Sequence, residues 1–177
     1  MSDRPSWQHR TYGDGTQPIF NETTYEPGFS WLLETCETVE DWGCGMAWGR
    51  RYVPEGRYKG VDGSPDAARF ADVTCDLRDH VTSVDGIFMR HILEHNEDWQ
   101  VILGNAMRSF RKRFVLVTFT PFGDQTRRLN DGGLIDLSFR KEDLTVFFAG
   151  CSWREEHYDM PESQYGLNDC FFVERCG

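Results

Sequence analysis

The order of predicted elements constrains the fold of this chain most strongly, because strands and helices alternate through its first two-thirds. Residues 38–42, 57–64, 71–79, 84–91 and 113–122 each contain a predicted strand. Helical segments are predicted at 27–36, 46–53, 64–70 and 96–113, with Asn96 as the N-cap of the last. This alternation is typical of an α/β fold built on a parallel sheet. A helix at 139–150 and two strands at 152–160 and 169–176, close in sequence, indicate an antiparallel strand at one edge.

The length and composition indicate one globular domain over residues 1–177. Apolar residues make up 39% of the chain and aromatic residues 14%, which is typical of a folded core. Residues 1–25 lack periodicity, so we expect an irregular arm that can fold over a site as a lid. No apolar run approaches the roughly 20 residues of a membrane span, and no signal-peptide core is present. The six cysteines form no CxxC pair. These features predict a cytoplasmic protein with free thiols and no zinc ribbon.

The charge of the chain argues against nucleic acid as a partner. The formal net charge is −10, whereas nucleic-acid binders usually present a basic face to the phosphates. The densest basic cluster, "RSFRKR" at 108–113, is interpreted as the end of a helix, where cations interact favourably with the helix dipole. A phosphate-binding patch is the alternative interpretation. We expect a small-molecule partner and no membrane contact; the oligomeric state is left open.

A glycine-rich segment, "VEDWGCGMAWGRR" at 39–51, follows the first predicted strand. Ligands of open α/β sheets bind at the carboxyl ends of the strands, where glycines let them approach the backbone. The spacing of Gly43, Gly45 and Gly49 differs from the GxGxxG dinucleotide fingerprint. Asp41 would also repel a pyrophosphate, and it would attract a ligand that carries positive charge. The segment therefore disfavours a nicotinamide-dependent reductase.

Two further acids follow the next predicted strands. Asp62 ends the second strand, at the approximate spacing of a ribose-binding acid, and Asp76 follows the third. S-adenosylmethionine carries an ammonium group, a sulfonium and a ribose diol, and it has no phosphate. Three carboxylates at successive strand ends are suited to that ligand.

At this point the chain resembles the class I S-adenosylmethionine-dependent methyltransferases. The resemblance rests on "VEDWGCG", "YKGVDGS", "VTCDLRD" and "DGIFMRHILEH", and it covers about residues 27–122. It implies a Rossmann-like seven-stranded sheet in the order 3-2-1-4-5-7-6, with strand 7 antiparallel. The phrases "LEHNEDW" and "FTPFGDQT" are also similar to small methyltransferases of phages and actinobacteria. The first helix is unusually short, and no inserted substrate domain is present, so the acceptor stays open.

The resemblance also implies the cofactor, S-adenosyl-L-methionine, with S-adenosyl-L-homocysteine as its product, and the residues that bind it. The ribose is assigned to Asp62 and Gly63, and the adenine to Asp76 and Leu77. Arg90 or His91 is expected to close the site from the fourth strand. The methionine side is assigned to five consecutive residues of the glycine segment: Asp41, Trp42, Gly43, Cys44 and Gly45.

The segment "RHILEHNED" supplies the candidate catalytic residues His91, Glu94 and His95. Its HxxEH pattern matches an inverted zinc-protease motif, but His91 lies just past a predicted strand and not on a helix. Glu94 and His95, with His157, are an alternative metal set, although we expect no metal. A histidine here suits a general base near neutral pH, or it has a structural role.

The sequence predicts a methyltransferase that acts on an oxygen or nitrogen nucleophile of an unidentified small molecule. The Asn/Asp-Pro-Pro-aromatic motif of DNA amino-methyltransferases is missing after the fourth strand. The Pro-Cys nucleophile of cytosine C5 enzymes is missing from the sequence. A catalytically inactive cofactor-binding module, or an accessory subunit, is the alternative. The candidate acceptor walls are residues 120–130 and the aromatic residues Trp7, Tyr12, Phe20 and Tyr25.

Overall fold

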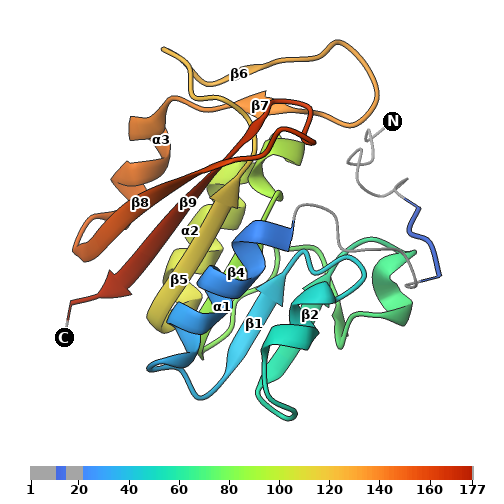
Figure 1. Cartoon of the computed structure of the whole chain (residues 1–177), viewed down its shortest axis with the longest axis vertical. Coiled ribbons are helices and arrows are strands. Elements are labelled where there is room, and N and C mark those ends of the chain that lie inside the picture. The colour runs from blue at the N-terminus through green and yellow to red at the C-terminus, as the bar shows by residue number, and fades with distance from the viewer. Residues whose placement is uncertain (1–10, 15–21, 177) are drawn as a thin grey trace.

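A seven-stranded mixed sheet forms the centre of the protein in a computed structural model, which describes residues 11–14 and 22–176 (Figure 1). Its strand order is β3-β2-β1-β4-β5-β9-β8. This is the order predicted from the sequence, since β9 and β8 occupy the positions of strands 7 and 6. The strands are β1 Val39–Trp42, β2 Tyr58–Asp62, β3 Val73–Thr74, β4 Val84–Arg90, β5 Phe110–Thr118, β8 Cys151–Asp159 and β9 Leu167–Arg175.

The strand directions place one edge of the sheet at the carboxyl ends of β1 to β5. These five strands run parallel, with Asp41 paired to Gly60 of β2 and to Phe88 of β4. Strand β9 runs antiparallel to β5, and β8 runs antiparallel to β9, as the closing pair of strands predicted. The turn between β8 and β9 therefore reaches the same edge as the loops that follow β1, β2 and β4 (Figure 1).

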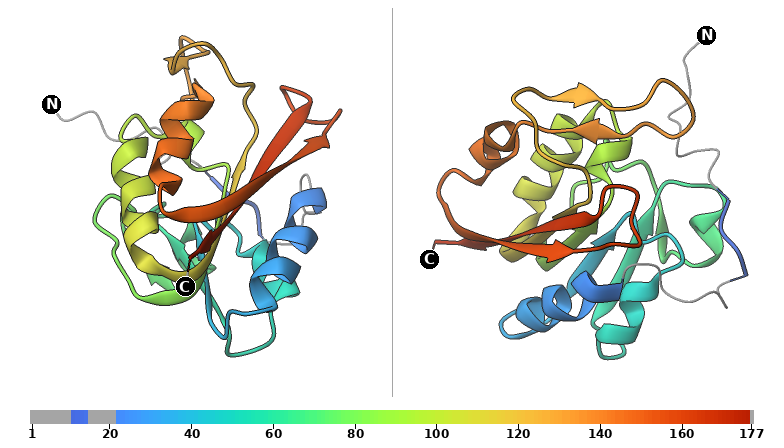
Figure 2. Two further views of the ribbon diagram at one scale, coloured as in Figure 1. Left: turned by 90° about the vertical axis from the view of Figure 1, so that its left-hand side faces the viewer. Right: turned by 45° about the horizontal axis from the view of Figure 1, so that its top comes forward.

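Helices cover both faces of the sheet (Figure 2). Helix α1 (Tyr25–Leu33) and the short helix η3 (Trp48–Tyr52) lie on one face, where Phe29 and Phe88 stack with ring centroids 4.3 Å apart. Helix α2 (Trp99–Ser109), α3 (Lys141–Thr145) and η6 (Val146–Phe148) pack on the other face. Both faces of the central strands are buried, which explains the continuous apolar runs in β4 and β5, such as Ile87–Met89 and Phe114–Val117.

The boundary between α2 and β5 differs from the prediction. The helix ends at Ser109 and β5 starts at Phe110, so most of the basic cluster lies on a strand and not at a helix end. Phe110 and Phe114 are buried, and burial of these rings favours an extended start for the segment. The N-cap of α2 is Asp98, whereas the Asn96 amide donates to Ile92 O over 2.6 Å; the predicted N-cap was wrong.

Several short elements complete the fold. Helix η2 (Glu22–Thr24) precedes α1. Helix η4 (Ala67–Arg69) follows β2, and helix η5 (Leu93–His95) follows β4. A two-stranded sheet of β6 (Arg127–Arg128) and β7 (Leu137–Ser138), which the sequence analysis did not anticipate, lies in the segment after β5. Trp7 and Phe20 of the predicted arm lie outside the described residues. Within the described part, no helix is long and apolar enough to cross a membrane.

Candidate functional site

The turn after β1 depends on glycine. Gly43 has a φ of +73° and Gly45 a φ of +53°, a left-handed region in which side chains are strained. A Cβ on Gly43 would lie 1.9 Å from Cδ1 of Ile92, in the segment that follows β4. The amides of Gly43 and Cys44 donate to Val61 O over 2.7 and 3.2 Å. The missing side chains thus let the turn fold back over β2 and approach the β4 loop.

Asp62, at the end of β2, holds two backbone segments together. Its Oδ2 accepts from the Gly45 amide over 2.8 Å, and its Oδ1 accepts from the Ser64 amide over 2.7 Å. The carboxylate therefore fixes the glycine turn against the loop after β2. Both loops lie at the carboxyl edge of the sheet, where ligands of such folds bind.

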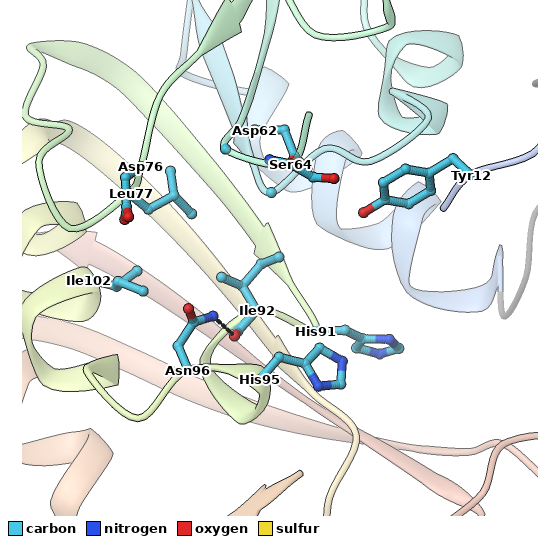
Figure 3. Close-up of a pocket in the computed structure, with 12 residues that line it drawn as sticks. Tyr12, Asp62, Ser64, Asp76, Leu77, His91, Ile92, His95, Asn96 and Ile102 are labelled. Carbon is cyan, nitrogen blue, oxygen red and sulfur yellow. Dashed lines mark hydrogen bonds between the residues drawn. The ribbon is translucent and has the colours of Figure 1, made fainter. Parts of the chain in front are cut away.

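A cavity, called here the first cavity, opens between these loops and the segment after β4 (Figure 3). Figure 3 shows Asp62, Ser64 and Tyr12 on one side, with Ile92, Asn96 and His95 across from them. The lining residues are Tyr12, Gly43, Asp62, Gly63, Ser64, Asp76, Leu77, His91, Ile92, His95, Asn96 and Ile102.

Asp76 and Leu77 close one end of the first cavity. Leu77 is buried and packs in the core between the sheet and α2. Asp76 accepts from Arg78 through both carboxylate oxygens, with the shortest contact at 2.6 Å. Burial alone would raise the pKa of Asp76, but the hydrogen bonds and charge of Arg78 outweigh it and hold that pKa below its usual value. A carboxylate is therefore present at this end near neutral pH.

A larger cavity, called here the second cavity, continues from the first toward the β8–β9 turn. The two share Tyr12, Gly43, His91, Ile92 and His95. The other lining residues of the second cavity are Tyr25, Cys44, Gly45, Met46, Trp48, Arg90, Phe119, Asn130, Gly132, Leu134, Asp136, Ser163 and Gln164.

His91 occupies a strained backbone position immediately after β4. Its φ is +56°, which is uncommon for a residue other than glycine and is often found at functional sites. Its Nε2 lies 2.9 Å from Oδ1 of Asn168 on β9, and its ring lies 4.8 Å from the Phe119 ring. The preceding Arg90 donates to Thr24 Oγ1 over 3.0 Å, with its guanidinium over the Tyr25 ring. His91 is thus held by β9, and Arg90 is held by Thr24 and Tyr25 at the start of α1.

His95 lies on η5, where the two cavities meet. Its Nδ1 is 2.7 Å from Ile135 O and 3.3 Å from Oδ1 of Asp136. Only 10% of its side chain is exposed. The ring packs against Phe119, with centroids 5.3 Å apart. The loop before β7 therefore sets the orientation of this imidazole.

Three of the predicted site residues lie behind the cavities and not on their surface. Trp42 is fully buried in the core, and its Nε1 donates to Glu40 over 2.9 Å. Asp41 accepts from the Tyr58 hydroxyl over 2.7 Å. Burial raises the pKa of Asp41 to about 7, and the nearby charge of Asp62 acts in the same direction. The expectation that Asp41 meets the ligand directly does not match this placement.

Glu94 is the third residue behind the cavities. It is fully buried, and its Oε1 accepts from the Phe119 amide over 2.7 Å. Burial raises the pKa of Glu94 to about 7. His157, the third member of the alternative metal set, lies on β8, where its Nδ1 is 2.8 Å from Asp169. Among the described residues, no group of three histidine, cysteine, aspartate or glutamate side chains is placed to hold a metal ion.

Several residues of the second cavity were missed by the sequence analysis. They come from the loop between β6 and β7 and from the turn between β8 and β9, which supply Leu134, Asp136, Ser163 and Gln164. Asn130 lies in the segment predicted as an acceptor wall, but the others stand in loops without periodicity or a recognisable motif. Their place in the site depends on the antiparallel return of β9, which brings a distant turn to the cavity.

Buried polar atoms without partners gather around the two cavities. Ser64 Oγ, Trp48 Nε1 and Ser163 Oγ accept or donate no hydrogen bond within the described part of the chain. Each belongs to a residue that lines a cavity. Polar atoms of a ligand or of water at these places would satisfy them.

Comparison with known proteins shows the fold of this chain. No protein-family model and no curated protein sequence matches it. Among solved structures, it is similar to magnesium protoporphyrin IX methyltransferase from Synechocystis with bound S-adenosylhomocysteine. The identity is 18% and the TM-score 0.67, over 93% of this chain and 91% of the other.

Two further structures extend the likeness. An N1-methyltransferase from Burkholderia thailandensis, with bound 1,6-didemethyltoxoflavin and S-adenosylhomocysteine, has a TM-score of 0.64 at 19% identity, over 88% of this chain and 80% of the other. An amino pentose methyltransferase from Micromonospora echinaspora has a TM-score of 0.63 at 14% identity, over 92% and 94%. The chain has the fold of the class I methyltransferases. The fold places its ligand-binding edge where both cavities lie.

Proposed function

We propose that this protein is an S-adenosyl-L-methionine-dependent methyltransferase. The observation that carries the proposal is the first cavity, in which Asp62 and Asp76 stand at the ends of neighbouring strands beside a glycine turn. Ser64 Oγ and Trp48 Nε1, which have no partner in the described part of the chain, provide polar groups that a nucleoside and an amino-acid chain can satisfy. The structural neighbours that hold S-adenosylmethionine or its product add to this support.

The residues around the cavities suggest how the cofactor is held. Asp76 and Leu77 would meet the adenine, and Asp62 with Gly63 the ribose. The methionine side would lie along Gly43, Cys44 and Gly45, with Arg90 facing its carboxylate. Asp41 and Trp42 would support the turn from behind. When bound, S-adenosylmethionine supplies an electrophilic methyl group on its sulfonium.

The protein's own contribution is to orient the acceptor, exclude water and accept a proton. His91 and His95 are the candidate bases, because both line the two cavities. Glu94 would act indirectly, by holding the backbone of Phe119. We propose an oxygen or nitrogen nucleophile of a small molecule as the acceptor. The acidic charge of the chain supports a small molecule over nucleic acid.

Calorimetric titration with S-adenosylhomocysteine tests the cofactor assignment. We expect saturable binding of one equivalent, and a loss of about tenfold or more in affinity for Asp62→Asn, since one carboxylate loses its charge at a buried site. Asp72→Asn is a matched control: this carboxylate accepts from the Gly60 amide of β2 but lines neither cavity. Absence of binding by the folded wild type, or equal losses in both variants, would refute the assignment.

The second candidate function is an inactive cofactor-binding or accessory module with the same fold. Such a module would also bind the cofactor in the first cavity, but it would require no base beside the second cavity. Transfer of a labelled methyl group to low-molecular-weight acceptors, in a protein that binds S-adenosylhomocysteine, would exclude this alternative.

A further inference from the structure

The contacts of His95 define which of its nitrogens can accept a proton. A backbone carbonyl accepts hydrogen bonds and cannot donate them, so the Nδ1 that lies 2.7 Å from Ile135 O must carry the hydrogen. In a neutral imidazole, Nε2 is then the atom with the available lone pair. No hydrogen bond from a described residue reaches His95 Nε2. The residue lines both cavities, so its basic nitrogen belongs to the site.

Asp136 supports this orientation. Its Oδ1 lies 3.3 Å from His95 Nδ1, and its Oδ2 accepts from the Tyr165 hydroxyl over 3.0 Å. The residue is 6% exposed. Burial alone would raise the pKa of Asp136, but its hydrogen bonds to His95 and Tyr165 outweigh this and hold the pKa below its usual value. A negative charge therefore stands behind the imidazole and helps to fix its orientation.

Two aromatic rings, those of Phe119 and His91, line the second cavity next to His95. The Phe119 ring lies 4.8 Å from the His91 ring, 5.3 Å from the His95 ring and 5.7 Å from the Tyr165 ring. Phe119 is held by a hydrogen bond from its backbone amide to the buried Glu94. Such a group of rings favours a planar, aromatic ligand. The buried Ser163 Oγ, which has no hydrogen-bond partner among the described residues, lies in the same cavity and offers one polar contact.

We propose that His95 Nε2 is the base for an aromatic hydroxyl acceptor bound beside Phe119, and that Asp136 is its positioning residue. The proposal rests on the proposed methyltransferase function. His95 takes the hydroxyl proton, and an oxygen electron pair forms the new carbon–oxygen bond. The carbon–sulfur bond of the donor breaks, with its electron pair remaining on sulfur. The products are an aryl methyl ether, S-adenosylhomocysteine and an imidazolium that returns its proton to solvent.

The acceptor class is tested with matched probes of equal shape. Phenol and 1-naphthol are offered as hydroxyl acceptors, and aniline and 1-naphthylamine as the corresponding amines, each with labelled S-adenosylmethionine. Binding of 1-naphthol to the protein loaded with S-adenosylhomocysteine is measured separately by calorimetry. We expect methyl ethers from the hydroxyl probes, little transfer to the amines, and weaker binding of 1-naphthol by Phe119→Leu of about tenfold.

The role of Asp136 is tested by separating binding from turnover. Asp136→Asn should lower the turnover number about tenfold or more, with 1-naphthol binding within about twofold of wild type. His95→Gln should lower turnover by about a hundredfold or more. Asp169→Asn is the matched control, because it changes the partner of His157, which lines neither cavity. That variant should keep wild-type turnover.

The outcomes separate this proposal from the proposed function. A protein that binds S-adenosylhomocysteine but neither binds nor methylates the hydroxyl probes overturns the acceptor class and leaves the cofactor assignment standing. Preferred methylation of the amines overturns it as well. If Asp136→Asn loses binding and turnover in parallel, or matches Asp169→Asn in turnover, Asp136 is not a positioning residue. Failure to bind S-adenosylhomocysteine at all refutes the proposed function itself.

Discussion

At the scale of single residues, Gly43 carries the tightest steric requirement of the site. Gly43→Ala combines a left-handed φ of +73° with a Cβ placed 1.9 Å from Ile92 Cδ1. We expect a loss of stability of about 2 kcal/mol or more, from backbone strain and from displacement of the Ile92 segment. The affinity for S-adenosylhomocysteine should fall as well, because that segment borders both cavities. Urea unfolding and calorimetric titration measure the two effects.

Gly56→Ala separates backbone strain from the clash. Gly56 has a similar φ of +81°, but no atom beyond its chain neighbours lies within 4 Å of the place that a Cβ would take. We therefore expect a loss of only about 1 kcal/mol, from backbone conformation alone, with cofactor affinity unchanged. Equal losses of stability and equal affinities in the two variants would contradict the role given to Gly43.

The buried carboxyl of Asp41 makes stability depend on pH. Its pKa is raised from 3.8 to about 7, chiefly by burial, so the folded state holds a proton that the unfolded chain has released. Its contribution to stability is full below about pH 4 and is lost as the pH rises through about 7. In Asp41→Asn this dependence is removed, and the amide can still accept from the Tyr58 hydroxyl.

Urea unfolding of wild type and Asp41→Asn across this range gives the comparison. We expect the stability of the variant relative to wild type to increase between about pH 4 and about pH 7 and then to level off. Asp85→Asn is the control: the lowered pKa of Asp85 confines its pH dependence to the range below about pH 4, so the difference between this variant and wild type should stay constant from about pH 4 to about pH 7. Burial opposes ionisation there, but the Glu37 amide and the Lys112 and Arg111 side chains lower the pKa of Asp85. A constant difference between wild type and Asp41→Asn would contradict the assignment.

The sequence predicted those residues whose chemistry is local. Gly43, Asp62 and Asp76 follow predicted strands, and a strand end at the carboxyl edge of a parallel sheet faces the cavity. Asp41 satisfied the same rule, yet Tyr58 on β2 holds it behind the turn. Asp136 and Ser163 could not be predicted, because only the three-dimensional path of β7 and β9 brings their loops to His95 and Phe119.

At the scale of elements, Arg113 joins α1 to two strands. Its guanidinium donates to Glu34 over 2.7 Å and to Glu174 of β9 over 2.8 Å, and it lies 4.4 Å from the Trp31 ring. Only 8% of the residue is exposed. We expect Arg113→Leu to cost about 1–3 kcal/mol, less than a fully buried pair because both carboxylates keep contact with solvent.

Arg140→Leu is the matched control for this prediction. Arg140 pairs with Glu142 at the surface, where the side chains are 52% and 69% exposed, and we expect no measurable loss of stability. Denaturant unfolding of both variants gives the difference. Similar stabilities for the two would show that Arg113 does not couple α1 to the sheet.

The position of Arg113 also shows why one element boundary was mispredicted. In sequence, Arg108 to Arg113 continue the polar spacing of an amphipathic helix, so the helix was expected to extend through them. In the fold, Phe110 and Arg113 pair with Val84 and Gly86 of β4, and Arg113 meets its carboxylates across α1 and β9. These partners are distant in sequence, and they override the local propensity.

At the scale of the whole molecule, the site is assembled from loops on one edge of a rigid sheet. The parallel α/β sheet was predictable because alternating strands and helices leave few ways to bury their apolar faces, whereas the strand order came from the resemblance to the class I methyltransferases. The second cavity was not predictable. It forms only because the long segment between β5 and β8 meets the β8–β9 turn above that edge. The proposed cofactor site and the proposed acceptor site thus draw on two different parts of the chain.

This division predicts how hydrogen exchange changes across the molecule when S-adenosylhomocysteine binds. A ligand bound only by the folded state slows opening of the segments that it contacts. We expect added protection at 43–47, 62–64, 76–77 and 91–96, whose residues line the first cavity or adjoin it. The edge strand β8 and helix α3, which border neither cavity, serve as internal controls and should exchange as before. Protection concentrated in β8, or spread evenly over the chain, would place the ligand elsewhere.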